Sequence, residues 1–132
     1  MIPKNKIFTF LAALFLICLV FSHAAPVPGD FATVTLAILD GKITFTQVED
    51  GNVKVEGKIN KGIEKNTPDD YFVQIAMPKV SFPQFGIKKI EVPGTARWKT
   101  VSPGEVNQLI GLDLLILHKD EVLDSGTIII PP

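Results

Sequence analysis

Apolar and polar side chains alternate with a period of two over the first half of the chain that follows an apolar N-terminal block. Segments 32–39, 42–48 and 53–59 each show this alternation, which is typical of strands with one buried and one solvated face. Asp40-Gly41 and the stretch Glu49 to Asn52 separate the three segments and carry turn residues. We therefore expect an antiparallel meander over residues 32–59.

The second half continues in short apolar segments divided by Pro, Gly and charged residues. A polar loop is expected over 60–70, a loop or broken edge strand over 79–86, a connection over 102–108 and an acidic turn over 119–125. Pro93-Gly94 indicates a hairpin within this half. The expected strands are 71–77, 87–92, 95–101, 109–118 and 127–130.

No stretch after residue 24 shows sustained helical periodicity. About eight short strands with frequent turns predict an all-β fold, an antiparallel Greek-key sandwich or flattened barrel. The length of 132 residues fits a single domain of this kind.

The N-terminal block has the pattern of a secretory signal. Lys4 and Lys6 precede the apolar run 7–21, and small residues follow it. We expect a signal peptide over 1–24, a flexible leader over 25–31 and a secreted domain over 32–132. An uncleaved N-terminal anchor is the alternative, although the run is short for a membrane span.

Charge and reactive side chains narrow the range of functions. Loss of Lys4 and Lys6 would lower the net charge from −1 to −3. Arg97 is the one arginine and no basic run occurs, which argues against nucleic acid or an anionic membrane as the main partner. The one cysteine, Cys18, and His23 lie in the expected signal, so His118 is the one imidazole of the mature domain. A thiolate nucleophile and a multi-histidine metal cage are thereby excluded from that domain.

Two strings in the meander resemble the opening of copper/zinc superoxide dismutases. They are Gly41 to Gln47, reading GKITFTQ, and Val53 to Ile59, reading VKVEGKI. The stretch Leu109 to His118 with the following Asp120 to Asp124 resembles a later segment of that family, which ends in a histidine and an acidic turn. The resemblance implies a superoxide dismutase-like fold.

The departures from this family concern its metal ligands. The resemblance places Phe72 and Gln74 where the family has two copper-ligating histidines, and neither residue type can replace imidazole as a copper ligand. The interval from Gln74 to His118 lacks the family's zinc-ligating histidines, and the loop with a superoxide-guiding arginine is missing. We therefore expect no catalytic residue and no cofactor.

His118 is the one candidate metal ligand, as a weak relic of the copper site. The family's histidine follows the strand glycine by six positions, whereas His118 follows Gly111 by seven. Because one extra residue in a strand turns the side chain to the other face, we expect His118 to face away from the old copper position unless a bulge absorbs that residue. The alternative is an ordinary histidine at a strand end.

The other candidate groups each have a structural interpretation beside a functional one. Asp69-Asp70 and the group Asp120, Glu121 and Asp124 could act as paired carboxylates, but such residues at strand ends are more often caps. The loop Ser81 to Gly86 could present aromatic side chains to a partner, or Phe82, Phe85 and Phe72 could fill the space that the family uses for metal. Trp98 is expected in the core rather than as a sugar platform.

The sequence thus predicts a secreted superoxide dismutase-like domain that has lost most metal ligands and acts as a non-catalytic binding or structural module. Its partner would be an unidentified extracellular protein or ligand, with no stable membrane anchor after cleavage. Two alternatives remain open. The first is a residual dismutase or copper-handling protein that uses His118, and the second is an unrelated secreted β-sandwich with a binding or effector role.

Overall fold

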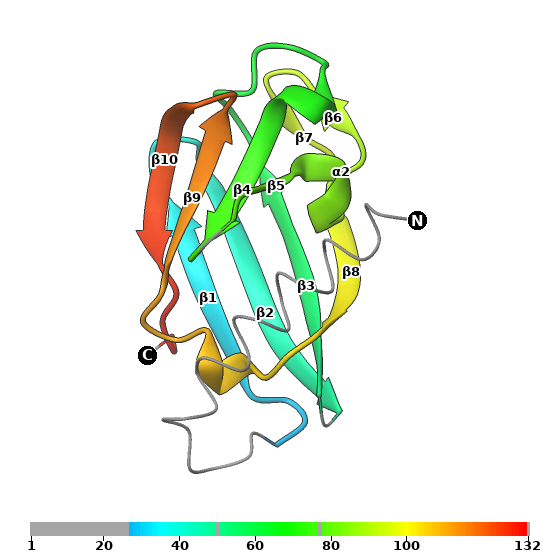
Figure 1. Ribbon diagram of the computed structural model, residues 1–132, viewed down its shortest axis with the longest axis vertical. Helices are drawn as coiled ribbons and strands as arrows, with labels where there is room; N and C mark the ends of the chain where they lie inside the picture. The colour runs from blue at the N-terminus through cyan, green and yellow to red at the C-terminus, as the bar shows by residue number, and fades with distance from the viewer. Residues whose placement is uncertain (1–26, 50, 77, 132) are drawn as a thin grey trace.

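The computed structural model describes residues 27–49, 51–76 and 78–131, and it forms a sandwich of two four-stranded antiparallel sheets (Figure 1). The expected all-β sandwich is confirmed. Sheet A has the strand order β1-β2-β3-β8 and sheet B the order β10-β9-β4-β5. The strands of sheet A are β1 (Phe31–Leu36), β2 (Gly41–Glu49), β3 (Asn52–Ile59) and β8 (Trp98–Pro103). Those of sheet B are β4 (Tyr71–Ile75), β5 (Val80–Ser81), β9 (Asp113–His118) and β10 (Glu121–Thr127).

The meander β1-β2-β3 follows the alternation of the sequence. Buried and solvated positions alternate along all eight residues of β3, and the apolar positions face sheet B. Glu49 pairs with Asn52, so a two-residue turn joins β2 to β3, and Gly51 in this turn has a φ of 80°. This φ lies in the left-handed region that glycine adopts without strain.

Three connections cross between the sheets and give the Greek-key arrangement. The first leads from β3 through the 3₁₀ turn η1 (Pro68–Asp70) to β4. The second returns from β5 to β8 through a small hairpin of β6 (Ile90–Glu91) and β7 (Gly94–Thr95). The third leads from β8 through the 3₁₀ turn η2 (Val106–Gln108) to β9. The two sheets are joined at one edge by a bridge between Thr33 and Ile129.

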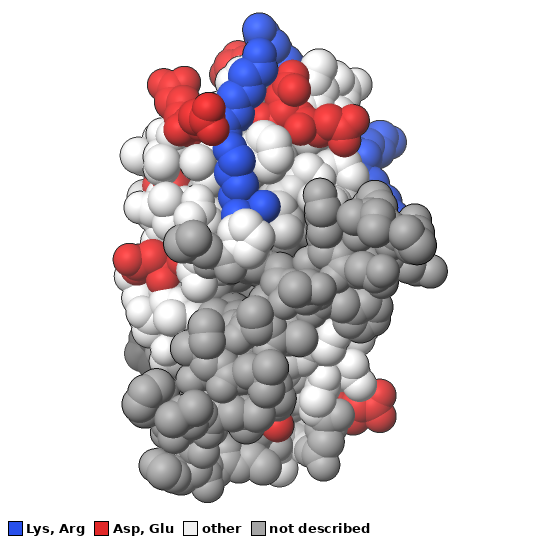
Figure 2. Space-filling view, in the orientation of Figure 1, with Lys and Arg blue, Asp and Glu red and all other residues white. Residues whose placement is uncertain are grey.

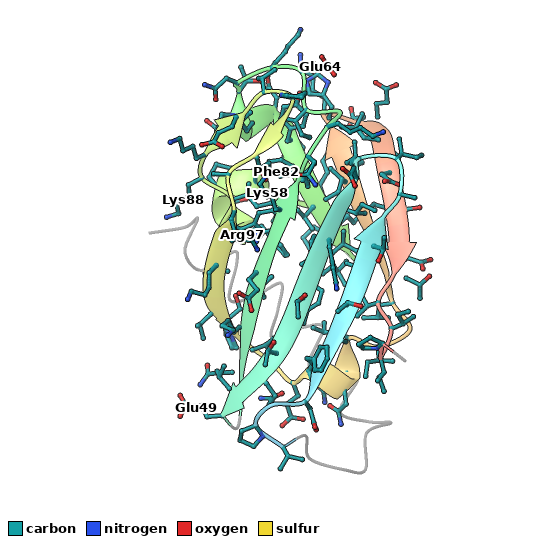
Figure 3. All side chains as sticks on the ribbon, turned by 180° about the vertical axis from the view of Figure 1, so that it is seen from behind. Glu49, Lys58, Glu64, Phe82, Lys88 and Arg97 are labelled. Carbon is teal, nitrogen blue, oxygen red and sulfur yellow. The ribbon has the colours of Figure 1, made fainter. Side chains whose placement is uncertain are left out.

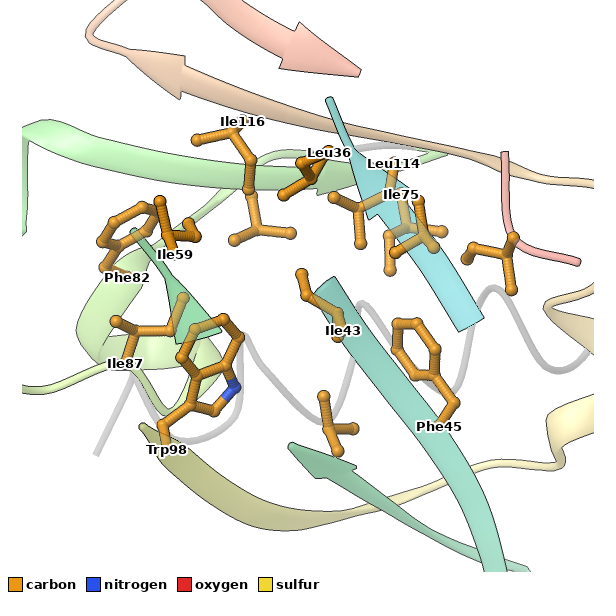
Figure 4. Close-up of a cluster of buried hydrophobic side chains, with 14 of the residues drawn as sticks. Leu36, Ile43, Phe45, Ile59, Ile75, Phe82, Ile87, Trp98, Leu114 and Ile116 are labelled. Atoms are coloured by element: carbon orange, nitrogen blue, oxygen red, sulfur yellow. The ribbon is translucent and has the colours of Figure 1, made fainter. Parts of the chain in front are cut away.

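One continuous apolar core lies between the sheets (Figure 4). Sheet A contributes Ile43, Phe45 and Ile59, and sheet B contributes Ile75, Leu114 and Ile116, all at most 1% exposed. Trp98 is 5% exposed and belongs to this core, as the sequence predicts.

Residues 79–101 differ from the sequence expectation. Segment 79–86 contains β5 and the one-turn helix α2 (Phe82–Phe85), which Ser81 and Gln84 cap reciprocally and Gly86 ends with a φ of 112°. The expected hairpin of 87–92 with 95–101 is reduced to β6 and β7, because β8 pairs with β3 instead.

The C-terminal segment also differs. The strand expected over 109–118 begins only at Asp113, since Gly111 turns the chain with a φ of 91°. The expected acidic turn 119–125 is mostly strand β10, which pairs with β9 and contains a bulge between Val122 and Asp124. The last strand expected over 127–130 is reduced to the single bridge at Ile129.

The described part of the expected leader is attached to the sandwich. Gly29 donates a backbone hydrogen bond of 2.8 Å to Gln47, and Gln47 donates one of the same length to Asp30. Contacts with the domain therefore begin before Ala32. The expected signal over 1–24 lies outside the described residues.

Candidate functional site

His118 lies at the end of β9, directly opposite Tyr71 of β4. The imidazole packs on the Tyr71 ring with 4.7 Å between the ring centroids. Its Nε2 atom is buried and has no hydrogen-bond partner among the described residues. Because Tyr71 belongs to the buried face of β4, His118 stands on the core side of sheet B.

Phe72 and Gln74, which the resemblance assigns to the copper position, lie on the other face of the same sheet. They alternate with the buried residues Tyr71, Val73 and Ile75. Phe72 pairs with Leu117 and Gln74 with Leu115, so neither meets His118. Both positions therefore lie on the face of sheet B opposite to that of His118, because β9 runs without a bulge.

Leu117 takes the outward position next to His118 in β9. Leu117, rather than His118, follows Gly111 by six positions, and it stands opposite Phe72 on the outer face of sheet B. A bulge does occur nearby, but it lies in β10. The strand register thus places His118 on the core side of sheet B and Phe72 on the other face.

A lysine is fixed over this outer face. The Lys79 Nζ atom lies 4.4 Å from the centre of the Phe72 ring. It donates hydrogen bonds of 2.8 Å each to the Lys119 carbonyl oxygen and to Oδ1 of Asp120. The Lys79 ammonium lowers the pKa of Asp120 below its ordinary value, mainly through this hydrogen bond and also through its charge.

The residues at these positions do not fit copper. Phenylalanine and leucine offer no donor atom, the amide of Gln74 is a poor copper ligand, and an ammonium group beside them repels a metal cation. Among the described residues there is no group of three or more His, Cys, Asp or Glu side chains able to hold a metal ion.

The acidic residues have separate structural surroundings. Asp124 is buried and accepts hydrogen bonds from the backbone N–H groups of Ile38, at 2.8 Å, and Leu39, at 3.0 Å. It thereby caps the turn between β1 and β2. Asp120 is exposed and binds Lys79. Acidic and lysine side chains also gather at the upper end of the sheet B side of the molecule in Figure 2.

The aromatic residues of 82–85 lie on the core side rather than with Phe72. Phe82 is fully buried and stacks on Tyr71 with 5.4 Å between ring centroids. Phe85 is half-buried and packs against the same core. A shared filling of one space by Phe72, Phe82 and Phe85 is therefore wrong, because sheet B separates Phe72 from the other two.

A basic surface on the opposite side of the sandwich was not foreseen from the sequence. Two adjoining open hollows, of about 540 and 350 Å³, share Arg97 as a lining residue. We call them together the Arg97 surface. In the view onto sheet A, Lys58, Arg97 and Lys88 lie near one another along one side (Figure 3). The cations that line the surface are Lys42, Lys58, Lys88, Lys89, Arg97 and Lys99, against the two carboxylates Asp40 and Glu56.

The cluster is not apparent in the sequence because its cations lie far apart along the chain. Lys42, Lys58 and Lys99 come from three different strands, and each occupies a solvated position of the alternating pattern. A search for basic runs misses such a group, whereas a count of outward-facing cations on adjacent strands of the meander would have revealed part of it.

Comparison with known proteins supports the fold and no more. No protein-family model matches the chain, and no curated protein does. Among solved structures, the chain is similar to the crystal structure of the clock protein EA4, with a TM-score of 0.55 and 18% identity over 83% of this chain and all of that one. In the part of the chain that the structure describes, no helix is long and apolar enough to cross a membrane.

Proposed function

We propose that the chain is a secreted, superoxide dismutase-like sandwich that binds an extracellular partner and has no dismutase activity. The observation that carries this proposal is the set of residues at the positions of the copper ligands. Phe72, Gln74 and Leu117 share the outer face of sheet B there, and the Lys79 ammonium lies over Phe72.

The chemistry of disproportionation supports the proposal. The reaction needs a metal that cycles between two oxidation states, and copper is held by several imidazole ligands. The outer face of sheet B offers none at the three positions, and His118 is on its core side. The strand pattern therefore resembles that of superoxide dismutases, whereas the positions assigned to copper lack suitable donor atoms.

The test is to load the purified protein with copper, dialyse it, and measure both bound copper and the decay of superoxide. We expect no stoichiometric copper and a decay rate equal to that of buffer. Stoichiometric copper together with a decay rate far above buffer would overturn the proposal.

A second candidate function is copper handling by His118. One observation favours it, since the buried Nε2 atom of this residue has no hydrogen-bond partner among the described residues. If this function holds, His118→Gln removes copper binding, whereas the control Gln74→Leu leaves it unchanged. If neither variant alters the copper content, His118 is structural.

A further inference from the structure

The Arg97 surface carries more positive charge than its own neighbours neutralise. Lys42, Lys88, Arg97 and Lys99 form no ion pair within the described residues, although Lys89 contacts Glu91 at 3.5 Å. Of the two lining carboxylates, Glu56 contacts Lys54, which lies outside the surface. This excess of cations occurs in a chain whose net charge is −1.

The strand register brings like charges together at the centre of the surface. Lys42 of β2 and Lys58 of β3 are directly opposite partners, and both side chains point outward. Directly opposed like charges destabilise a sheet. Arg97, immediately before β8, lines the same hollow as these lysines. Since neighbouring strands lie about 4.8 Å apart, the three cations form a row across the sheet.

The rest of the lining is rich in hydrogen-bonding groups. Thr35, Thr44 and Asn60 line the larger hollow and Thr100 the smaller one. Asn60 accepts a hydrogen bond of 2.8 Å from Lys58 Nζ and donates one of 2.6 Å to the Asp40 carbonyl oxygen, whereas no side-chain hydrogen bond within the described residues engages the three threonines. None of the large exposed apolar residues lines either hollow, and the lining Trp98 is only 5% exposed.

The residues that line the Arg97 surface indicate which class of polyanion it fits. Single-stranded nucleic acid is bound on exposed aromatic platforms, and a membrane surface takes up exposed apolar side chains. The described lining has neither. A polysaccharide with regularly spaced anionic groups matches both features that are present, because its anions pair with the row of cations and its hydroxyl groups pair with the threonine hydroxyls of the lining.

We propose that the Arg97 surface binds an acidic polysaccharide, with Lys42, Lys58 and Arg97 contacting successive sulfate or carboxylate groups. This inference names the partner of the proposed function and rests on it. The two fail separately, since copper content and superoxide decay test the absence of dismutase activity without any polysaccharide.

The experiment measures binding of the full secreted protein to heparin as the sulfated probe and polygalacturonate as the carboxylated one. Neutral dextran, poly-glutamate and anionic phospholipid vesicles are the comparison ligands. We expect binding to at least one acidic polysaccharide, no binding to dextran, and weaker binding to poly-glutamate and vesicles. Preferential binding to either of the last two, or no binding to any polysaccharide, would overturn the proposal.

A matched pair of variants locates the site. Lys42→Gln with Arg97→Gln removes two charges from the surface, and Lys61→Gln with Lys65→Gln removes two exposed charges elsewhere. We expect the first variant to lose about tenfold in affinity and to lower the slope of log affinity against log salt by roughly two, as release of counterions requires. The second should stay within about twofold of the wild type.

The melting temperature shows whether the first variant loses affinity because it is less stably folded. Because Lys42→Gln relieves the repulsion with Lys58, the melting temperature of the first variant should be no lower than that of the wild type. Equal loss of affinity in the two variants would place the site elsewhere and refute the proposal.

Discussion

Individual polar residues of this sandwich act mainly by satisfying backbone groups. Gln47 is 1% exposed, and its Nε2 donates to the carbonyl oxygens of Glu49, at 2.6 Å, and Asn52, at 2.8 Å. Its Oε1 accepts from the Val106 N–H group at 2.9 Å. The glutamine that takes part in the family resemblance thus ties the β2–β3 turn to η2 and has a structural role.

Asp124 allows a direct test of such a role. Asp124→Asn replaces one of the two accepting oxygens by an amide nitrogen, so at least one backbone N–H group in the set of Ile38, Leu39 and Ser125 loses its acceptor. We expect the free energy of unfolding, measured with denaturant, to fall by about 2 kcal/mol. The control Asp113→Asn, at an exposed residue, should cost no more than about 0.5 kcal/mol. Equal losses would show that burial of Asp124 contributes nothing.

The Lys79–Asp120 contact predicts a shift in titration. The ammonium favours the charged carboxylate, so Lys79→Met should raise the pKa of Asp120 toward its ordinary value of 3.8, as followed by carboxyl-carbon NMR. The folded-state pKa is depressed, so any stability from this pair is present above the ordinary value and is lost as pH falls through the folded pKa. An unchanged pKa in Lys79→Met would mean that the contact does not persist in solution.

At the scale of elements, one glycine fixes how β3, β2 and β8 pack. Gly57 pairs with Trp98 of β8, and a Cβ added there would lie 2.7 Å from the Lys42 carbonyl oxygen and 3.0 Å from the indole. Only glycine lets Trp98 lie flat over this part of sheet A. The glycine of the VKVEGKI string is therefore explained by packing.

Gly57→Ala should accordingly displace the indole. We expect a loss of about 1–3 kcal/mol in stability and a red shift of the tryptophan emission, which reports on Trp98 alone because the chain has one tryptophan. Gly29→Ala serves as the control for added bulk, since a Cβ there meets nothing within 4 Å, although its φ of 98° strains the backbone. An unshifted emission in Gly57→Ala would contradict the packing account.

The elements that the sequence predicts well are those in which alternation and turn residues agree. β1, β2 and β3 follow the pattern because their outer positions are polar and their inner ones apolar. The sequence does not predict β10 as a strand, because its bulge interrupts the alternation of apolar and polar residues. In addition, the buried position of β10 is occupied by the carboxylate Asp124 rather than by an apolar side chain. α2 escapes because a single capped turn is too short to show a helical period.

At the scale of the whole molecule, sequence reasoning reached the fold class but only part of the candidate site. The face of His118 follows from its pairing with Tyr71, which the sequence does not reveal, because Gly111 lies in a turn outside β9 and alternation cannot be counted from it. Of the Arg97 surface, only the cations on the meander could be foreseen, since the rest needs the pairing of β3 with β8 and the placement of Lys88 and Lys89 beside them.

The same topology gives the two sides of the sandwich different chemistry. The outer face of sheet B holds Phe72 and Gln74, which the resemblance assigns to copper, and Leu117 opposite Phe72, whereas cations gather over sheet A (Figure 3). Under the proposed function, loss of the metal and binding of a partner concern opposite sides of the molecule.

The most direct test of the central proposal introduces imidazoles on the outer face of sheet B. The variant Phe72→His, Gln74→His and Leu117→His places three of them on neighbouring positions of β4 and β9, where paired residues have Cβ atoms about 5 Å apart. Isothermal titration with Cu²⁺, together with the melting temperature with and without the metal, measures the gain. The matched control is the double variant Phe72→His and Gln74→His, in which Leu117 is unchanged. Its one other described imidazole, that of His118, lies on the core side of sheet B.

We predict that the triple variant binds one Cu²⁺ at least about a hundredfold more tightly than the wild type and melts at a higher temperature when copper is present. The control with Leu117 should gain much less. Equal copper affinity in the two variants, or no gain in either, would contradict the proposal that Phe72, Gln74 and Leu117 occupy positions equivalent to the copper ligands of superoxide dismutases.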